Sequence, residues 1–141
     1  AVKPVAGCPA GATAAAAPSA RNLKFQARYP LFDLWTATYD SPNFQTGEPP
    51  YETEGGEIVV DQNGDPVIQR IEPIRLAITV PHGPGLDMPA AGWPTVIYAH
   101  GTGGDYLSFF RDGTAARMAE EGLASISFDQ VLHGPRNPQP P

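Results

Sequence analysis

The alternation of hydrophobic and polar positions predicts strands along most of this chain. Residues 24–29 and 31–39 are rich in aromatic side chains and alternate in part, which indicates two short strands or a strap over a sheet. Residues 71–81 alternate, with Ile74, Leu76, Ile78 and Val80 on one face, and predict a strand that ends at Pro81. Residues 95–99 form a nearly continuous apolar run, which is typical of a strand covered on both faces.

The hydrophobic period becomes helical after Tyr106. The apolar stripe consists of Leu107, Phe110, Thr114 and Met118. Asp105 is placed to cap the start of this helix, and Gly122 is placed to end it in a left-handed conformation. Residues 123–129 then return to a strand pattern, so strand, glycine turn, helix and strand predict a β-α-β unit with a parallel strand pair. In such a pair residues 100–104 and 129–134 end at one sheet edge, and we expect them to be neighbours.

The connection before the third strand contains strong turn signals. Residues 41–56 are dense in turn formers and predict a loop. Asn63 and Gly64 stand between two β-branched runs and predict a hairpin with a type I′ turn, because both residues accept positive φ. The same region matches positions 1, 3, 5 and 12 of a calcium-binding loop with Asp61, Asn63, Asp65 and Glu72. Pro66 replaces the glycine that such a loop requires, so the hairpin remains the preferred interpretation and no metal site is predicted.

Composition and charge narrow the classes of function. The chain has 141 residues, enough for one domain, in which residues 1–22 read as a flexible Ala/Pro-rich tail and residues 23–141 as the folded part. A net charge of −6 with scattered basic residues argues against a nucleic-acid partner. No apolar run approaches 18 residues, so no transmembrane segment is predicted.

Cys8 is the single cysteine and bears on localisation. Val5-Ala6-Gly7-Cys8 resembles a bacterial lipobox, although Lys3 and Pro4 occupy the place of an apolar signal core. Two alternatives stay open: a mature secreted protein cut before Ala1, or a disulfide from Cys8 to another chain. We expect a secreted or periplasmic/outer-surface protein, with lipid anchoring through Cys8 as the less favoured route.

The turn His100-Gly101-Thr102-Gly103-Gly104 carries the most specific chemistry. Gly101 and Gly103 fit a dinucleotide fingerprint, but Tyr106 stands where its third glycine belongs, and no lysine follows Lys24 to make a P-loop. We therefore predict no nucleotide cofactor. The remaining candidate is an oxyanion hole, in which backbone N–H groups face a carbonyl oxygen that becomes negative in the transition state.

This turn and a second loop resemble a known family. "TVIYAHGTGG" resembles the His-Gly turn after the third strand of α/β-hydrolase lipases and esterases. "DQVLHGPR" (129–136) resembles the D-x-x-L-H-G-x-R loop of bacterial extracellular and virulence-factor-type lipases. The resemblance covers residues 71–136, about half of the chain. It implies an α/β fold that is the N-terminal half of an α/β-hydrolase sheet, a β-hairpin and strands followed by the β-α-β unit, completed by a missing second half.

The resemblance also implies roles for individual residues. The Thr102 backbone N–H takes the position that donates to the oxyanion, and Gly101, Gly103 and Gly104 let the loop turn. His100 is implied to support the loop rather than act as a base. The other implied site residues are Asp129 and His133, which brace the two loops against each other, and Tyr106, which lines the acyl pocket or simply packs.

The family's nucleophile motif G-x-S-x-G is missing from this chain. None of its serines is flanked in that way: Ser19, Ser41, Ser108, Ser125 and Ser127. We therefore expect a serine-type carboxylic ester hydrolase, of esterase or lipase type, whose Ser, Asp and His lie on a second polypeptide, this chain being inactive alone. A truncated piece of a longer enzyme is the alternative on that point. The alternative functions are a noncatalytic α/β-hydrolase-like binding module and, more weakly, a nucleotide-binding domain.

Overall fold

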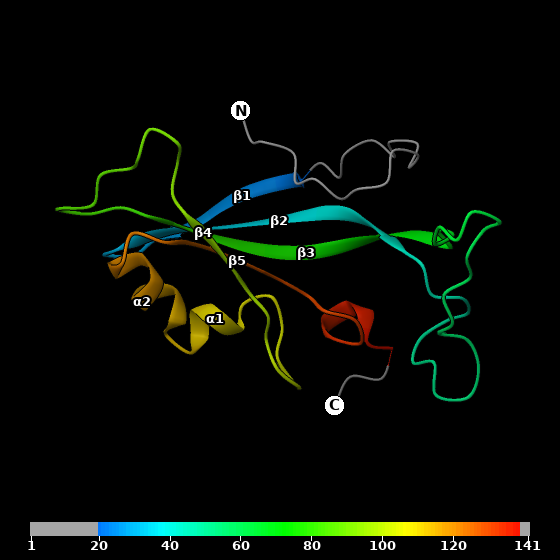
Figure 1. Cartoon of the computed structure of the whole chain (residues 1–141). Coiled ribbons are helices and arrows are strands. Elements are labelled where there is room, and N and C mark those ends of the chain that lie inside the picture. Colours follow the sequence, from blue (N-terminus) through cyan, green and yellow to red (C-terminus); the bar gives the residue numbers. More distant parts are fainter. Residues whose placement is uncertain (1–19, 139–141) are drawn as a thin grey trace.

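Five strands form one mixed sheet in the computed structural model, which describes residues 20–138 (Figure 1). In spatial order β1-β2-β3-β5-β4, the strands are β1 (Ala20–Arg28), β2 (Phe32–Asn43), β3 (Arg70–Pro81), β5 (Ala124–Phe128) and β4 (Thr95–Tyr98). Neighbours from β1 to β5 are antiparallel, whereas β4 and β5 are parallel. Two short helices, α1 (Ser108–Arg111) and α2 (Thr114–Glu120), lie on one side of the sheet, and a 3₁₀ turn, η1 (Gly134–Arg136), follows β5.

All five strands predicted from the hydrophobic pattern are present, and the β-α-β unit with its parallel pair is confirmed. Two boundaries were wrong. β1 begins at Ala20, inside the predicted tail, and β2 continues to Asn43, inside the predicted loop. The reason is pairing, since β2 and β3 stay in register without interruption over twelve residues, from Phe32↔Pro81 to Asn43↔Arg70. Cys8 lies outside the described residues.

The chain reverses at Asn63-Gly64 through an antiparallel bridge, as predicted, but the predicted type I′ turn is wrong. Only an isolated bridge, Val60↔Pro66, joins the two β-branched runs, and Gly64 has positive φ (85°) whereas Asn63 does not. The Asp61 carboxylate instead accepts hydrogen bonds from the N–H groups of Asn63 (2.8 Å) and Asp65 (3.0 Å). This side chain thereby competes with the regular hairpin geometry. Glu72 is bonded elsewhere, so the calcium-type pattern does not assemble.

The single helix predicted after Tyr106 is broken in two. Gly113, at φ 83°, separates α1 from α2. Phe109, which the predicted stripe omitted, is the fully buried aromatic side chain of this segment. The predicted helix end at Gly122 is confirmed: it has φ 69°, and its N–H donates to the Ala119 carbonyl (3.0 Å) while that of Leu123 reaches the Met118 carbonyl (2.9 Å). These two bonds define a Schellman cap.

The main core lies between the helices and one face of the sheet. Its buried members are Phe32, Leu34, Ala77, Phe109, Ala115 and Ala119. On the sheet side, Thr79, Ser125 and Ser127 are also fully buried, and such small side chains let α2 approach the strands closely. The alternating face predicted for β3, Ile74 to Val80, therefore points away from the helices.

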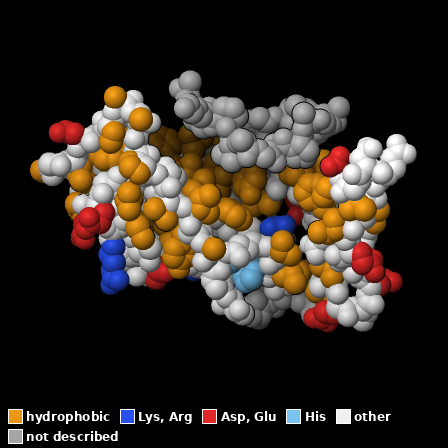
Figure 2. Space-filling view, in the orientation of Figure 1, with side chains coloured by type: hydrophobic (Ala, Val, Ile, Leu, Met, Phe, Trp, Pro, Cys, Tyr) orange, Lys and Arg blue, Asp and Glu red, His pale blue; other side chains and the backbone are white. Residues whose placement is uncertain are grey.

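That second face of the sheet is also apolar. Strand pairing aligns one row of large side chains across all five strands, namely Phe25, Trp35, Ile78, Ile126 and Ile97. Phe25 and Ile97, at the two ends of the row, are 50% and 68% exposed. Figure 2 shows hydrophobic side chains gathered over the middle of the molecule, where the strands lie. We call this row the open face.

β4 is the edge strand of the sheet among the described residues and pairs only with β5. Thr95 and Ile97 are exposed, so the prediction that this strand is covered on both faces is wrong for the described structure. An apolar run at a parallel edge is unusual, because parallel strands are normally buried on both faces. No helix within residues 20–138 is long and apolar enough to cross a membrane.

Candidate functional site

Two loops meet at the sheet edge where the parallel strands β4 and β5 end. We call residues 99–106 the β4 loop and residues 129–136 the β5 loop. The Gln130 side-chain amide donates to the His100 carbonyl (2.9 Å), and the Gln130 backbone N–H points at His100 Nε2 (3.4 Å). The imidazole rings of His100 and His133 lie edge to face with their centroids 4.7 Å apart. The predicted adjacency of the two loops is confirmed.

His100 is built into the base of the β4 loop. It is 5% exposed, and its Nδ1 lies 3.0 Å from the Gly101 carbonyl. A neutral ring with its proton on Nδ1 satisfies both contacts, since Nδ1–H then donates to that carbonyl and Nε2 accepts from Gln130. His100 therefore contacts both the turn that follows it and the β5 loop.

The three glycines of the β4 loop serve different purposes. A Cβ at Gly104 would lie within 3 Å of the His100 ring and of Ser108 Oγ, so this position requires glycine for space. Gly103 has open space around it but a φ of 77°, so it requires glycine for conformation. Gly101 has neither constraint, and its carbonyl accepts the Gly104 N–H (3.0 Å) that closes the turn.

Thr102 lies at the exposed tip of the β4 loop. Within residues 20–138 its backbone N–H donates to no acceptor. The turn closed by the Gly104 N–H and the buried His100 lie at the base of this tip. Tyr106, at the end of the loop, is partly buried against the core.

Asp129 connects three parts of the site. It is 1% exposed and accepts from Arg75 Nε (2.6 Å) and Nη2 (3.2 Å) on β3, and from the Tyr106 N–H (3.2 Å) on the β4 loop. The Arg75 guanidinium also lies over the Tyr106 ring, 4.4 Å from its centroid. The hydrogen bond to Asp129 raises the pKa of Arg75, so the guanidinium stays protonated. Asp129 and Tyr106 therefore hold the two loops together.

Sequence reasoning missed Arg75 and Gly134. Arg75 occupies a polar position of the alternating pattern of β3, so no local feature of the sequence distinguishes it from an ordinary polar strand residue. Gly134 has φ 56°, and a Cβ there would lie 2.6 Å from Arg75 Nη2 and 2.7 Å from Asp129 Oδ1. The backbone of the β5 loop thus packs directly on the ion pair. His133, half-buried next to it, has Nδ1 2.9 Å from the Val131 carbonyl.

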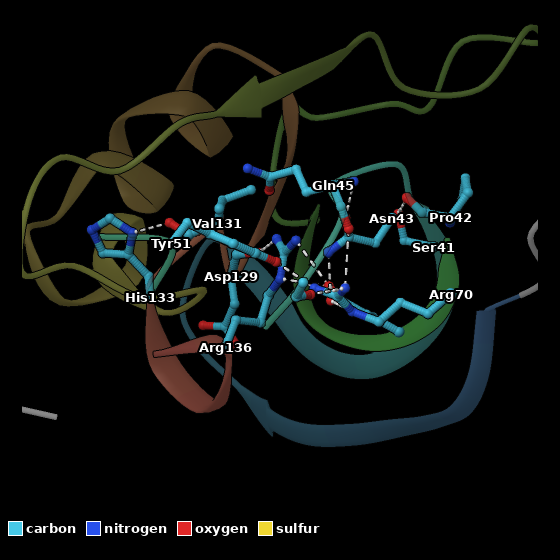
Figure 3. Close-up of polar contacts among 12 residues, drawn as sticks. Ser41, Pro42, Asn43, Gln45, Tyr51, Arg70, Asp129, Val131, His133 and Arg136 are labelled. Carbon is cyan, nitrogen blue, oxygen red and sulfur yellow. Dashed lines mark hydrogen bonds and ion pairs between the residues drawn. The ribbon is translucent and has the colours of Figure 1, made fainter. Parts of the chain in front are cut away.

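A second ionic cluster anchors the far side of the β5 loop (Figure 3). Glu72 accepts from Arg70 Nε (2.8 Å), Asn43 Nδ2 (2.6 Å) and Arg136 Nε (3.2 Å). Arg136 Nη1 also donates to the Asp129 carbonyl (3.0 Å). Burial acts to raise the pKa of Glu72, but the hydrogen bonds from Asn43 and Arg70 and the charge of Arg136 lower it on balance.

Comparisons with protein-family models, with curated proteins and with solved structures found no match to this chain. Within residues 20–138 no group of three His, Cys, Asp or Glu side chains is placed to hold a metal ion. The candidate site therefore consists of the β4 loop with the exposed Thr102, the β5 loop, and the ionic contacts that hold both to the sheet.

Proposed function

We propose that this chain is part of a serine-type carboxylic ester hydrolase and supplies one oxyanion-hole donor, the backbone N–H of Thr102. The observation that carries the proposal is a backbone amide without an acceptor, on the exposed residue Thr102, at the tip of a turn that is contacted by His100 and closed by Gly104. Donors held rigidly before the reaction stabilise developing negative charge without reorganisation. The position at the carboxyl ends of parallel strands is also where α/β sheets place ligands.

In the proposed reaction a serine attacks the ester carbonyl and forms a tetrahedral intermediate. Its negative oxygen accepts hydrogen bonds from the Thr102 N–H and from a second amide outside this chain, and water later hydrolyses the acyl-enzyme. Three of the four described serines, all but Ser41 in β2, do not fit the nucleophile's role. Ser125 and Ser127 are 1% and 0% exposed beneath the helices, and Ser108 Oγ accepts the Asp105 N–H (2.9 Å).

The nucleophile, acid and base are therefore assigned to a second polypeptide that completes the sheet. Two features of the described structure support this part of the proposal. β4 pairs on one side only, and the open face presents its most exposed large side chain, Ile97, on that same strand. A strand added beside β4 and a layer over Ile97 would bury both. We place the complete enzyme outside the cytoplasm, as a secreted or periplasmic protein.

A noncatalytic binding module built on the same two loops is the alternative function. The burial of Ser125 and Ser127 favours it, since those side chains cannot reach an ester. The two functions differ in one respect that can be measured, which is the presence of an activated serine in the purified protein.

The test is labelling with a fluorophosphonate probe, followed by intact masses under denaturing conditions. A labelled second polypeptide beside an unlabelled 15.0 kDa chain would support the proposal. Only an unlabelled chain would support the binding module, and a label on this chain would contradict the site assignment. A heat-denatured sample is the control, because labelling must depend on the folded site.

A further inference from the structure

A cavity lies beside the β5 loop, on the side away from the β4 loop. It measures about 280 Å³ and is bounded by the loop after β2, the start of β3 and the β5 loop. We propose that this cavity binds a small carboxylate that carries a ring or short apolar chain. If the proposed function holds, this ligand corresponds to the acid moiety of the ester, and that extension rests on the proposed function. The binding itself does not.

The backbone around the cavity is held in an unusual conformation. Three non-glycine residues in the described structure have positive φ, and two of them, Tyr51 (63°) and Leu132 (59°), line this cavity. This conformation is unfavourable for a residue with a Cβ atom. Such residues persist where surrounding contacts over-determine them, and they cluster at ligand sites. Here they come from two loops, 81 residues apart in the sequence (132 − 51), that line the same cavity.

The less exposed charged side chains of the cavity are two cations, Arg70 and Arg136, and one anion, Glu72. Arg70 and Arg136 both contact Glu72, so one carboxylate faces two guanidinium groups (Figure 3). The side chains of Arg70 and Arg136 are 24% and 16% exposed. Glu48, also on the lining, is exposed to solvent, which weakens its contribution. The negative charge of an anionic ligand would offset the positive charge of the second arginine.

The guanidinium of Arg136 has N–H groups that make no hydrogen bond within the described residues. It makes one bond from each nitrogen, to Glu72 from Nε (3.2 Å) and Nη2 (3.1 Å) and to the Asp129 carbonyl from Nη1 (3.0 Å). Each terminal nitrogen of arginine carries a second N–H, and a carboxylate accepts two such bonds side by side. Within the described residues no other acceptor takes these hydrogens.

The rest of the wall is apolar and suits a ring or short chain. Its members are Pro49, Pro73, Val131, Leu132 and Pro135. The volume of about 280 Å³ lies just below the range of about 300–1,000 Å³ for small-molecule sites, so the ligand is compact. These observations together define the class: one carboxylate for the arginines and a small hydrophobic body for the proline-rich wall.

The test uses benzoate as the probe and the purified protein with any polypeptide that stays bound to it. Benzoate titrated into isotope-labelled protein should shift the amide resonances of Tyr51, Val131 and Leu132 in one saturable process. Acetate lacks the ring and benzyl alcohol lacks the charge, so each should bind at least about tenfold more weakly. Shifts confined to other residues, or equal binding of all three compounds, would overturn the proposal.

Two substitutions with matched controls complete the test. Val131→Trp fills the cavity and should weaken benzoate binding at least about tenfold, whereas Val59→Trp, at an exposed valine outside the cavity, should leave it within twofold. Arg136→Met should weaken benzoate about tenfold and leave benzyl alcohol unchanged, with the exposed Arg117→Met on α2 as its control. Unchanged benzoate affinity in folded Val131→Trp would refute the proposal. Because no nucleophile is needed, a failed fluorophosphonate experiment would not affect this result.

Discussion

Arg75 and Asp129 form a two-point ion pair that joins the middle of the sheet to the end of β5, with Nε–Oδ2 and Nη2–Oδ1 distances of 2.6 and 3.2 Å. The carboxylate is 1% exposed and the guanidinium side chain 38% exposed. The same carboxylate accepts a hydrogen bond from the Tyr106 N–H, which connects the β4 loop to Asp129. The buried Asp129 carboxylate therefore holds both loops of the candidate site. Its ion pair with Arg75 offsets the free-energy cost of burying that charge.

Arg75→Met should destabilise the protein markedly. It leaves the Asp129 carboxylate buried without its counter-ion, which we expect to cost about 2–3 kcal/mol, less than for a fully enclosed pair because Arg75 is partly exposed. The control is Arg21→Met, which breaks a solvent-exposed pair with Asp40 and should cost at most about 1 kcal/mol. Urea unfolding measures both, and equal costs would show that the Arg75 pair has no special role.

Gly134→Ala should be more harmful than Gly64→Ala. Both glycines have positive φ, 56° and 85°, so each substitution carries a backbone cost of about 1 kcal/mol. Only at Gly134 would the new Cβ meet other atoms, the Arg75 Nη2 and Asp129 Oδ1, whereas nothing lies within 4 Å at Gly64. We expect at least about 1 kcal/mol more for Gly134→Ala from this overpacking. Identical unfolding midpoints would contradict the contact.

Thr102→Pro should reduce ester hydrolysis while Thr102→Ala should not. Proline has no backbone N–H, so it removes the proposed oxyanion donor, and the loss of one such donor lowers kcat by about 10²–10³-fold. Alanine retains the N–H, and we expect kcat within about threefold of the original protein. Steady-state hydrolysis of a short-chain ester measures both variants, with circular dichroism as the folding check. Full activity in folded Thr102→Pro would refute the role of this amide.

Stability should fall in acid through Glu72. The folded-state pKa of Glu72 lies below its ordinary value of 4.5, so the unfolded chain binds the proton more readily. The stabilisation is present above about pH 4.5 and is lost as the pH falls through the lowered folded-state pKa. Glu72→Gln should therefore be less stable near pH 7 and flatten the acid side of the profile. The exposed Glu120→Gln should reproduce the original profile; a similar flattening there would point to a general charge effect.

Ile97→Glu should block association with the second polypeptide. It places a charge on the open face at the unpaired strand β4, where the proposed layer would bury it. Met88→Glu is the control, since Met88 is similarly exposed (64%) but lies in a loop outside the sheet. Co-purification or size-exclusion chromatography with light scattering measures the complex. An unchanged complex with Ile97→Glu would exclude the open face as the docking surface.

Local patterns in the sequence were enough to predict how the candidate site assembles. Apolar runs of strand length, one helical segment and the cap at Gly122 together define a β-α-β unit. Because a crossover unit makes its two strands parallel, the segments after residues 98 and 128 must emerge at one edge. The meeting of His100 with His133 follows from that, and the structure confirms it.

Other features depend on contacts between distant residues and needed the tertiary structure. The pairing of Arg75 with Asp129, the requirement for glycine at Gly134 and the convergence of Tyr51 with Leu132 join segments that no local period relates. The sequence also did not indicate which face of β3 packs on the helices. Ala77 and Thr79, which face the helices, are less hydrophobic than Ile74, Leu76 and Ile78 on the opposite face. Periodicity reports which side chains are apolar, but only packing decides which face receives the helices.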